Sequence, residues 1–143
     1  MSIYKNILVA VNISTEAETV LSKAIKIAAL FESKITLVHI IEPVVVETNY
    51  DLSPTLDIEL QQNLTERANN FLSQLTEKMQ LNNAQSIVTV GKPKHEIHRL
   101  CEEENVDLVV IGTHGRRGVS MLLGSTANAV LHGTACDVLA VKL

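Results

Sequence analysis

The chain has 143 residues, of which 46% are hydrophobic and 3% aromatic, with no Trp and a formal net charge of −4 at pH 7. This length suits one domain, and a core built from Ile, Val, Leu and Ala favours parallel strands covered by helices. The negative charge excludes the broad basic surface typical of nucleic-acid-binding proteins.

The amino-terminal half alternates between strand and helix patterns. An apolar run over Asn6–Asn12 predicts a strand, and apolar residues at helical spacing predict a helix over 17–31. Thr15 and Glu18 have the spacing of a capping box at the start of this helix. The next apolar run, Lys34–Ile41, predicts the second strand. Residues 42–54 lack periodicity and contain two prolines, so we expect an irregular loop there.

The second half continues the same alternation. The expected elements are a long helix with an apolar stripe from Leu60 to Met79, a strand over Ser86–Val90, a helix with Pro93 in its first turn, a strand over 107–112, a short helix over Ser125–Leu131 with Gly133 at its C-cap, and a last strand over Asp137–Leu143. This regular order predicts an α/β fold, a single doubly wound (Rossmann-like) domain over residues 1–143 with a parallel sheet.

Ligands of such folds bind beyond the carboxyl ends of the strands, where the winding direction reverses. One segment there, "GTHGRRGVSMLLGST" from Gly112 to Thr126, has the composition of a phosphate-binding loop. Its glycines let backbone N–H groups approach a phosphate, and the following helix start adds donors. Arg116 and Arg117 add positive charge. A turn leading into an N-capped helix, with surface arginines, explains the same residues equally well.

Two well-known phosphate loops are absent. The chain contains no GxxxxGK followed by Ser or Thr, and the segment after the first strand, "VNISTEAET", contains no glycine. A Walker-type nucleoside triphosphatase and a dinucleotide-binding Rossmann domain are therefore excluded by their fingerprints.

The sequence resembles the universal stress protein family, of the UspA-like type. The resemblance spans the whole chain and includes "ILVAVNIS", "ITLVHIIEP", "VGKPKHEI", "VDLVVIGTHGRRG" and "LLGSTANAVLHGTACDVLAVKL". Nucleotide-binding members carry G-x2-G-x9-G followed by Ser or Thr. Here Gly112 and Gly115 match the first pair and Gly124-Ser125 the last, with eight residues between them.

The resemblance implies a five-stranded parallel sheet of order 3-2-1-4-5 flanked by four helices. It also implies ATP, with Mg²⁺, between the first and fourth strands. Gly112, Gly115, Gly124 and Ser125 would hold the phosphates and ribose, and Ile40 would line the adenine pocket. The complete set of expected ATP-binding residues is Val11, Asn12, Ile13, Ser14, Ile40, Gly112, His114, Gly115, Arg116, Arg117, Gly124, Ser125 and Thr126.

At Asn12 the family usually has Asp, so the charge of that carboxylate is missing here. The resemblance further implies a homodimer that pairs through the last strand, Asp137–Leu143. An apolar edge strand has the same tendency on physical grounds.

Catalytic groups are not evident. The acidic run over 102–104 reads as a solvated helix face, His39 as a core histidine, and His95 and His98 as surface or capping residues rather than metal ligands. His114 is expected to brace the loop, with a phosphate contact as the alternative. Nothing in the sequence is set up to activate a water in line with a γ-phosphate.

We therefore expect an ATP-binding regulatory or stress-response protein without a catalytic role. The alternatives are a nucleotide-free dimeric interaction module and, less favoured, a slow ATP-cleaving or adenylating enzyme. The loop over 42–54 could serve an unidentified protein partner.

The cysteines and the start of the chain bear on the compartment. Cys101 and Cys136 stand far apart and form no CxxC pair, so they read as small core residues in a reducing compartment. The first residues enter a strand with no apolar stretch long enough for a signal peptide or a membrane span. We expect a cytoplasmic protein with no nucleic-acid partner and no direct membrane insertion.

Overall fold

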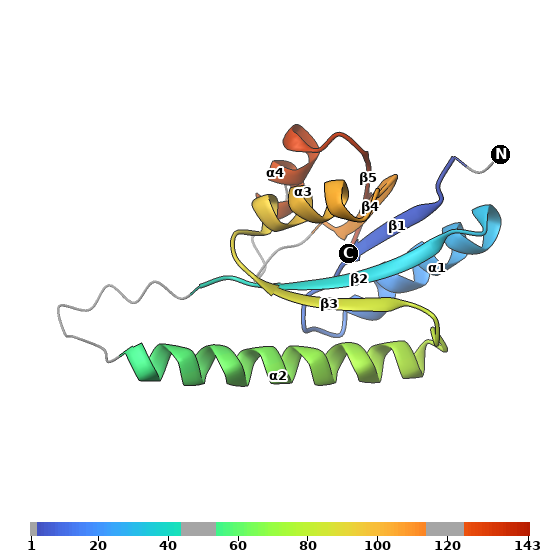
Figure 1. The fold of residues 1–143 in the computed structure, drawn as a ribbon. Coiled ribbons are helices and arrows are strands. Elements are labelled where there is room, and N and C mark those ends of the chain that lie inside the picture. Colours follow the sequence, from blue (N-terminus) through green and yellow to red (C-terminus); the bar gives the residue numbers. More distant parts are fainter. Residues whose placement is uncertain (1–2, 44–53, 114–124) are drawn as a thin grey trace.

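The computed structural model describes residues 3–43, 54–113 and 125–143, with the backbone alone at 54–57 and 125–126. Five parallel strands form one sheet of order β3-β2-β1-β4-β5 (Figure 1), as expected. The strands are β1 (Asn6–Ala10), β2 (Lys34–Ile41), β3 (Gln85–Val90), β4 (Leu108–Gly112) and β5 (Asp137–Val141).

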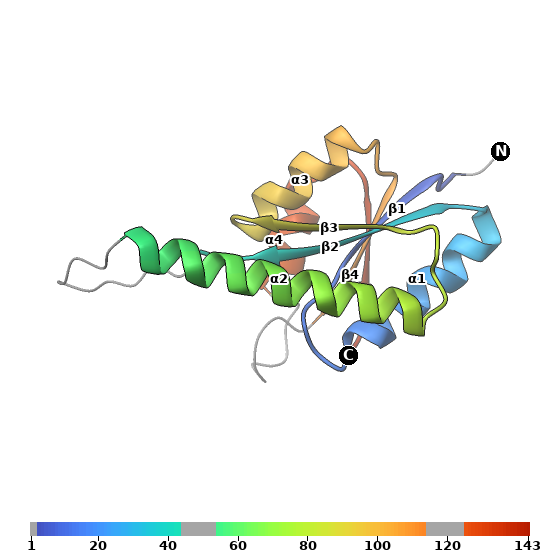
Figure 2. The same cartoon turned by 60° about the horizontal axis from the view of Figure 1, so that its bottom comes forward.

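Helices cover both faces of this sheet. They are α1 (Ala17–Phe31), α2 (Pro54–Lys78), α3 (Pro93–Glu103) and α4 (Ser125–Gly133). Helices α1 and α2 lie on one face, and α3 and α4 lie on the other (Figure 2). Each strand–helix–strand unit is therefore a parallel crossover, and the fold is the predicted doubly wound α/β type.

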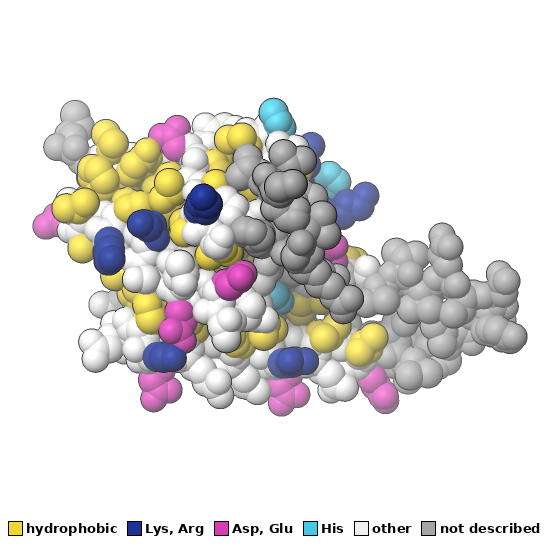
Figure 3. Space-filling view, turned by 180° about the vertical axis from the view of Figure 1, so that it is seen from behind, with side chains coloured by type: hydrophobic (Ala, Val, Ile, Leu, Met, Phe, Trp, Pro, Cys, Tyr) yellow, Lys and Arg dark blue, Asp and Glu magenta, His cyan; other side chains and the backbone are white. Residues whose placement is uncertain are grey.

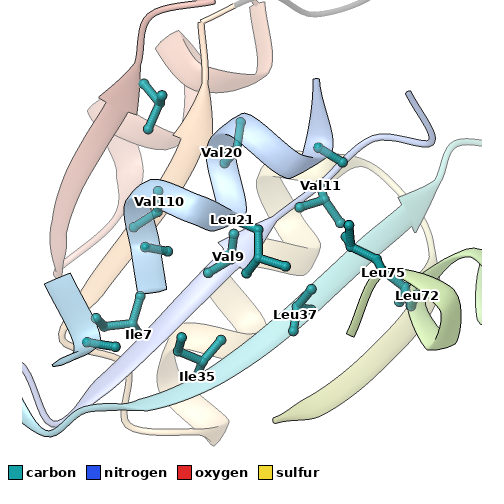
Figure 4. Close-up of a cluster of buried hydrophobic side chains, with 14 of the residues drawn as sticks. Ile7, Val9, Val11, Val20, Leu21, Ile35, Leu37, Leu72, Leu75 and Val110 are labelled. Carbon is teal, nitrogen blue, oxygen red and sulfur yellow. The ribbon is translucent and has the colours of Figure 1, made fainter. Parts of the chain in front are cut away.

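Each face of the sheet has its own apolar core. The core under α1 and α2 contains Ile7, Val9, Leu21, Leu37 and Leu72, all at most 1% exposed (Figure 4). The opposite core lies under α3 and α4 and is built from Leu8, Val38, Ile97, Leu100, Val109 and Val130. Successive residues of β1 thus enter opposite cores, as the alternation of side chains along a strand requires.

Three helix boundaries differ from the sequence prediction. Helix α1 has Glu16 as its N-cap, with no side-chain capping bond, so the predicted capping box at Thr15 is wrong. Helix α2 begins at Pro54, within the segment expected to be irregular, because a proline is compatible with a first helical turn. Gly133 is the last residue of α4 and lacks the positive φ of a glycine C-cap.

The strands also end earlier than expected. β1 ends at Ala10 and β5 at Val141, although the backbone N–H of Val11 still donates to Val38 O at 3.0 Å. Within the described ranges, no helix is both long and apolar enough to cross a membrane.

Candidate functional site

The winding of the sheet reverses between β1 and β4. These neighbouring strands are parallel, with Ala10 opposite Ile111. Val11, the residue after β1, and Gly112, the last residue of β4, therefore lie side by side at the carboxyl edge of the sheet. This is the position where doubly wound folds bind ligands.

The exit from β1 is anchored to β2. The carbonyl oxygen of buried Val11 accepts a hydrogen bond from Nδ1 of His39 at 2.8 Å, so His39 has the partner that the prediction required, although its side chain is half-buried rather than in the core. Beyond this anchor, Asn12 and Ser14 are exposed and Ile13 is half-buried. The anchor therefore holds the base of the turn while the side chain of Asn12 remains available to a ligand.

The exit from β4 is fastened to the end of β5. The N–H of Thr113 donates to Val141 O at 2.9 Å, and Thr113 Oγ1 accepts from the N–H of Leu143 at 3.2 Å. Gly112 is packed closely at this point, since a Cβ there would lie 2.7 Å from Cδ1 of Leu143 and 3.3 Å from Cγ2 of Val20. A larger residue at this position would therefore have to displace the end of the Leu143 side chain.

Helix α4 begins at Ser125, as predicted, and its first turn contains no acidic residue. Its first N–H groups have no partners within the helix, and the helix dipole adds partial positive charge. Ile40 is half-buried near the end of β2, opposite Thr89 of β3. The other expected site residues, His114, Gly115, Arg116, Arg117 and Gly124, lie outside the described residues, as do the side chains of Ser125 and Thr126.

A groove of about 470 Å³ lies between Ile13 and helix α2, on the α2 side of the predicted site. Its other lining residues are Asn63, Glu66, Arg67, Asn70, Phe71 and Gln74. The sequence prediction missed these residues because it treated α2 only as an apolar stripe. The available signal was the helical spacing of Asn63, Arg67, Asn70 and Gln74, which brings four polar side chains to one face.

A network of polar side chains lies at the carboxyl end of β3. Glu96 of α3 accepts hydrogen bonds from Arg99, at 3.0 and 3.3 Å, and from the hydroxyl of Thr89. Arg99 also donates to Glu103 at 2.9 Å, so part of the predicted solvated acidic face is paired. The bonds from Arg99 first, and from Thr89 second, hold the pKa of Glu96 below its ordinary value.

His95 and His98, the pair three residues apart, differ in their surroundings. His95 is exposed, whereas His98 is half-buried against Gly133 of α4. Across residues 3–43, 54–113 and 125–143, no three His, Cys, Asp or Glu side chains come together in a way that could hold a metal ion.

The two cysteines, far apart in sequence, come together in the fold. Sγ of Cys101 lies 3.3 Å from Sγ of Cys136, and both thiols are free and half-buried. The sequence prediction treated them as separate core residues and did not predict this contact.

The universal stress protein family model matches residues 3–142. Universal stress protein A homolog 1 of Coxiella burnetii is 36% identical over 138 residues, covering 96% of each chain. The solved structure of the hypothetical protein MJ0577 superimposes with a TM-score of 0.83 at 28% identity, covering 99% of this chain and 97% of that one. A universal stress protein solved in complex with cAMP has a TM-score of 0.71 at 20% identity, covering 97% of both chains.

The order of the strands, the glycine pattern after β4 and the match along almost the entire chain agree with one another. On this evidence, the protein belongs to the universal stress protein family.

Proposed function

We propose that this protein binds ATP, with Mg²⁺, at the carboxyl edge of β1 and β4. The observation that carries the proposal is the parallel pairing of these two strands at the point where the winding reverses. This pairing brings the turn at Asn12 and the start of the Gly112 loop to one edge. The cAMP complex of a protein with the same fold is consistent with an adenine nucleotide in this architecture.

Each side of the proposed site has a distinct task. The loop from Gly112 to Gly124 and the amino terminus of α4 would surround the phosphates with backbone donors. Asn12, exposed above the Val11 anchor, would face the sugar or base. The amide oxygen of Asn12 accepts a hydrogen bond, as a carboxylate does, but without the charge.

We infer a regulatory role in which nucleotide occupancy changes conformation or assembly. The sequence lacks a residue placed to activate water towards a γ-phosphate, so hydrolysis should be slow and incidental. This separates the proposal from the alternative of an ATP-cleaving or adenylating enzyme, for which multiple turnovers of ADP or pyrophosphate release would be required.

The nucleotide site can be tested by two variants with opposite effects. Asn12→Asp should tighten Mg-ATP binding about tenfold, because a charged hydrogen bond replaces a neutral one worth ~1–2 kcal/mol less. Gly124→Val should weaken binding by at least as much, because a side chain would obstruct the approach of the phosphates. Isothermal titration calorimetry on the full chain measures both effects.

His132→Ala, in the last turn of α4, is the matched control and should bind like the unchanged protein. A hundredfold excess of Mg-ATP over Kd should also stabilise the unchanged protein by about 2.7 kcal/mol in thermal unfolding. No adenine nucleotide after denaturing the purified protein, together with no thermal shift, would rule out the ATP proposal.

We further propose that two copies of the chain form a homodimer paired through β5. Such a dimer would also suit the alternative function, a dimeric interaction module. β5 is an edge strand that pairs only with β4 among the described strands. Hydrophobic side chains gather near the amino-terminal end of the chain (upper left in Figure 3). There Ile3 is 67% exposed, and the adjacent Tyr4 donates a hydrogen bond to Asp137 at the start of β5. An unpaired edge with apolar side chains nearby favours association of two copies.

The hydrogen-bond pattern of β5 supplies a selective test of this dimer. The backbone groups of Asp137 and Val141 point to β4, so those of Val138 and Ala140 point outwards. Ala140→Pro should therefore abolish strand pairing between copies while leaving the β4–β5 ladder intact. Light scattering after size exclusion should report a monomer for Ala140→Pro and a dimer for the control, Ala140→Ser. An unchanged dimer in both variants would contradict pairing through β5.

A further inference from the structure

The Cys101–Cys136 pair connects two elements on the same face of the sheet. Cys101 lies in the last turns of α3, and Cys136 precedes β5, 35 residues further along the chain. Their sulfur atoms are 3.3 Å apart, and both side chains pack against the core under α3 and α4. Since a disulfide bond is about 2.05 Å long, only a small movement separates this pair from bonding.

Thr134 places its hydroxyl group beside Cys136. The Thr134 hydroxyl oxygen lies 3.0 Å from Sγ of Cys136 and accepts a hydrogen bond from the Cys136 N–H at 3.3 Å. The same hydroxyl is 3.8 Å from Sγ of Cys101. The turn that carries Thr134 is tied to α4 by the bond from its N–H to Val130 O at 3.1 Å. The hydrogen bonds of Thr134 thus hold the thiol of Cys136 next to that of Cys101.

This arrangement makes the two sulfurs chemically unequal. A hydrogen bond donated by Cys101 first, and one from Thr134 second, lower the pKa of Cys136 to about 6, against the opposing effects of burial and Asp137. The pKa of Cys101 is raised, first because it donates to Cys136, then by burial and by the nearby negative charges. Of the two sulfurs, Cys136 is therefore the one favoured as the thiolate, and Cys101 the one favoured as the protonated thiol.

We propose that Cys101 and Cys136 form a redox-active dithiol site, in which a hydroperoxide oxidises Cys136 and Cys101 then closes an intramolecular disulfide. The thiolate of Cys136 attacks one peroxide oxygen, the O–O bond breaks, and the other oxygen leaves as an alcohol or as water after taking up a proton. Cys136 is then a sulfenic acid. The sulfur of Cys101 attacks the sulfur of Cys136, the S–O bond breaks, and the hydroxide leaves as water with the Cys101 proton.

The two cysteines together supply the two electrons that reduce the peroxide, and a dithiol reductant returns the site to its starting state. The half-burial of both thiols suits a small oxidant such as hydrogen peroxide and disfavours a bulky one. This site lies at the carboxyl end of α4, whereas the proposed nucleotide site lies at the amino terminus of the same helix.

Oxidation of the full chain with hydrogen peroxide, followed by intact-mass spectrometry and thiol titration, tests the proposal. The expected result is a loss of two hydrogen atoms per chain and of both free thiols, reversed by dithiothreitol. On a non-reducing gel the oxidised protein should migrate as a single chain. Chains linked to one another by a disulfide, or two thiols that persist while free cysteine is consumed, would overturn it.

Single variants separate the two roles. Cys101→Ser should stop at the sulfenic acid of Cys136, which dimedone labels, whereas Cys136→Ser should lose most of its reactivity. Equal labelling of the remaining thiol in both variants would contradict the assigned roles. Circular dichroism of each variant shows whether it has folded, and the unchanged chain provides the primary result in either case.

Thr134→Val tests the positioning role of the hydroxyl with little change in shape. The rate of oxidation at pH 7 should fall roughly threefold or more, and the pH at which the rate reaches half its maximum should rise, because the thiolate loses a hydrogen bond. Thr134→Ser should restore both. A rate profile unchanged in Thr134→Val would remove Thr134 from the site.

Discussion

Gly133 and His98 determine how closely α3 approaches the end of α4. A Cβ at Gly133 would lie 2.3 Å from Cε1 and 2.8 Å from Nε2 of the His98 ring. Nε2 of His98 is buried and has no hydrogen-bond partner among the described residues. The His98 ring is thus held by packing against the backbone of Gly133, and this packing is possible because Gly133 has no side chain.

Gly133→Ala should therefore destabilise the protein by about 1–3 kcal/mol, the usual cost of overpacking. In a His98→Ala background the same change should become neutral or stabilising by ~0.5–1 kcal/mol, because Ala favours a helix over Gly. Urea unfolding of the four proteins gives the coupling free energy. Equal effects of Gly133→Ala in both backgrounds would show that His98 does not limit the space.

The position of Gly133 shows what a sequence reveals at the residue scale. Its place near the end of α4 was predicted, but the C-cap role was wrong, because packing against a residue of another helix was the reason for the glycine. His39 is the opposite case: a histidine within an apolar strand implies a partner, and Val11 O provides it. A local sequence pattern can thus predict that a side chain has a hydrogen-bond partner, whereas packing between two helices can be seen only in the folded structure.

At the scale of elements, a hydrogen bond from the Thr89 hydroxyl to the Glu96 carboxylate joins β3 to α3. Glu96 lies between Arg99 on its own helix and Thr89 on the strand. Its side chain is only 16% exposed, so this carboxylate is better shielded from solvent than a usual surface ion pair. The network therefore fixes the start of α3 beside the carboxyl end of the sheet.

The lowered pKa of Glu96 gives this network a defined pH dependence. The carboxylate stabilises the folded state above about pH 5, and this contribution is lost as the pH falls through the lower, folded-state pKa. Glu96→Gln should therefore lower Tm at neutral pH, and the gap to the unchanged protein should close below about pH 4. Glu102→Gln, exposed on the same helix, is the control. A gap that stays constant with pH would contradict the role of the charge.

The boundaries of helices and strands were predicted best where the pattern of apolar residues is strongest. The bounds of β2 were predicted correctly over Lys34–Ile41, where a mostly apolar segment lies between Lys34 and Glu42. The start of α2 at Pro54 was missed, because the first turns of this helix carry few apolar residues in a regular stripe. Polar helix turns and loops are alike in composition, so periodicity cannot separate them.

At the scale of the whole molecule, the strand order was predicted correctly and the thiol contact was not. Alternating patterns and the family resemblance are sufficient for the order β3-β2-β1-β4-β5. Cys101 and Cys136 meet only because α3 and the turn after α4 lie on the same face of that sheet. The parallel pairing of β1 with β4 brings Val11 and Gly112 to the same edge of the sheet, while the loop residues beyond Thr113 lie outside the described ranges, so the nucleotide site stays a prediction.

A disulfide between these cysteines would cross-link the unfolded chain over a loop of 35 residues. Chain entropy then predicts that the oxidised protein is more stable by at most about 3–4 kcal/mol. The oxidised unchanged protein should melt several degrees higher than its reduced form. Cys101→Ser should melt at nearly the same temperature under both conditions. A lower melting temperature for the disulfide-linked form would indicate strain in the folded state.

The fastening of Thr113 to β5 also has a thermodynamic consequence. Two hydrogen bonds, with Val141 O and the Leu143 N–H, join the first residue of the loop to the end of the edge strand. A ligand bound to the loop and a second copy paired with β5 would therefore both act on these two hydrogen bonds. If either alters them, linkage demands reciprocity: the factor by which ATP changes the dimerisation constant must equal the factor by which dimerisation changes the affinity for ATP.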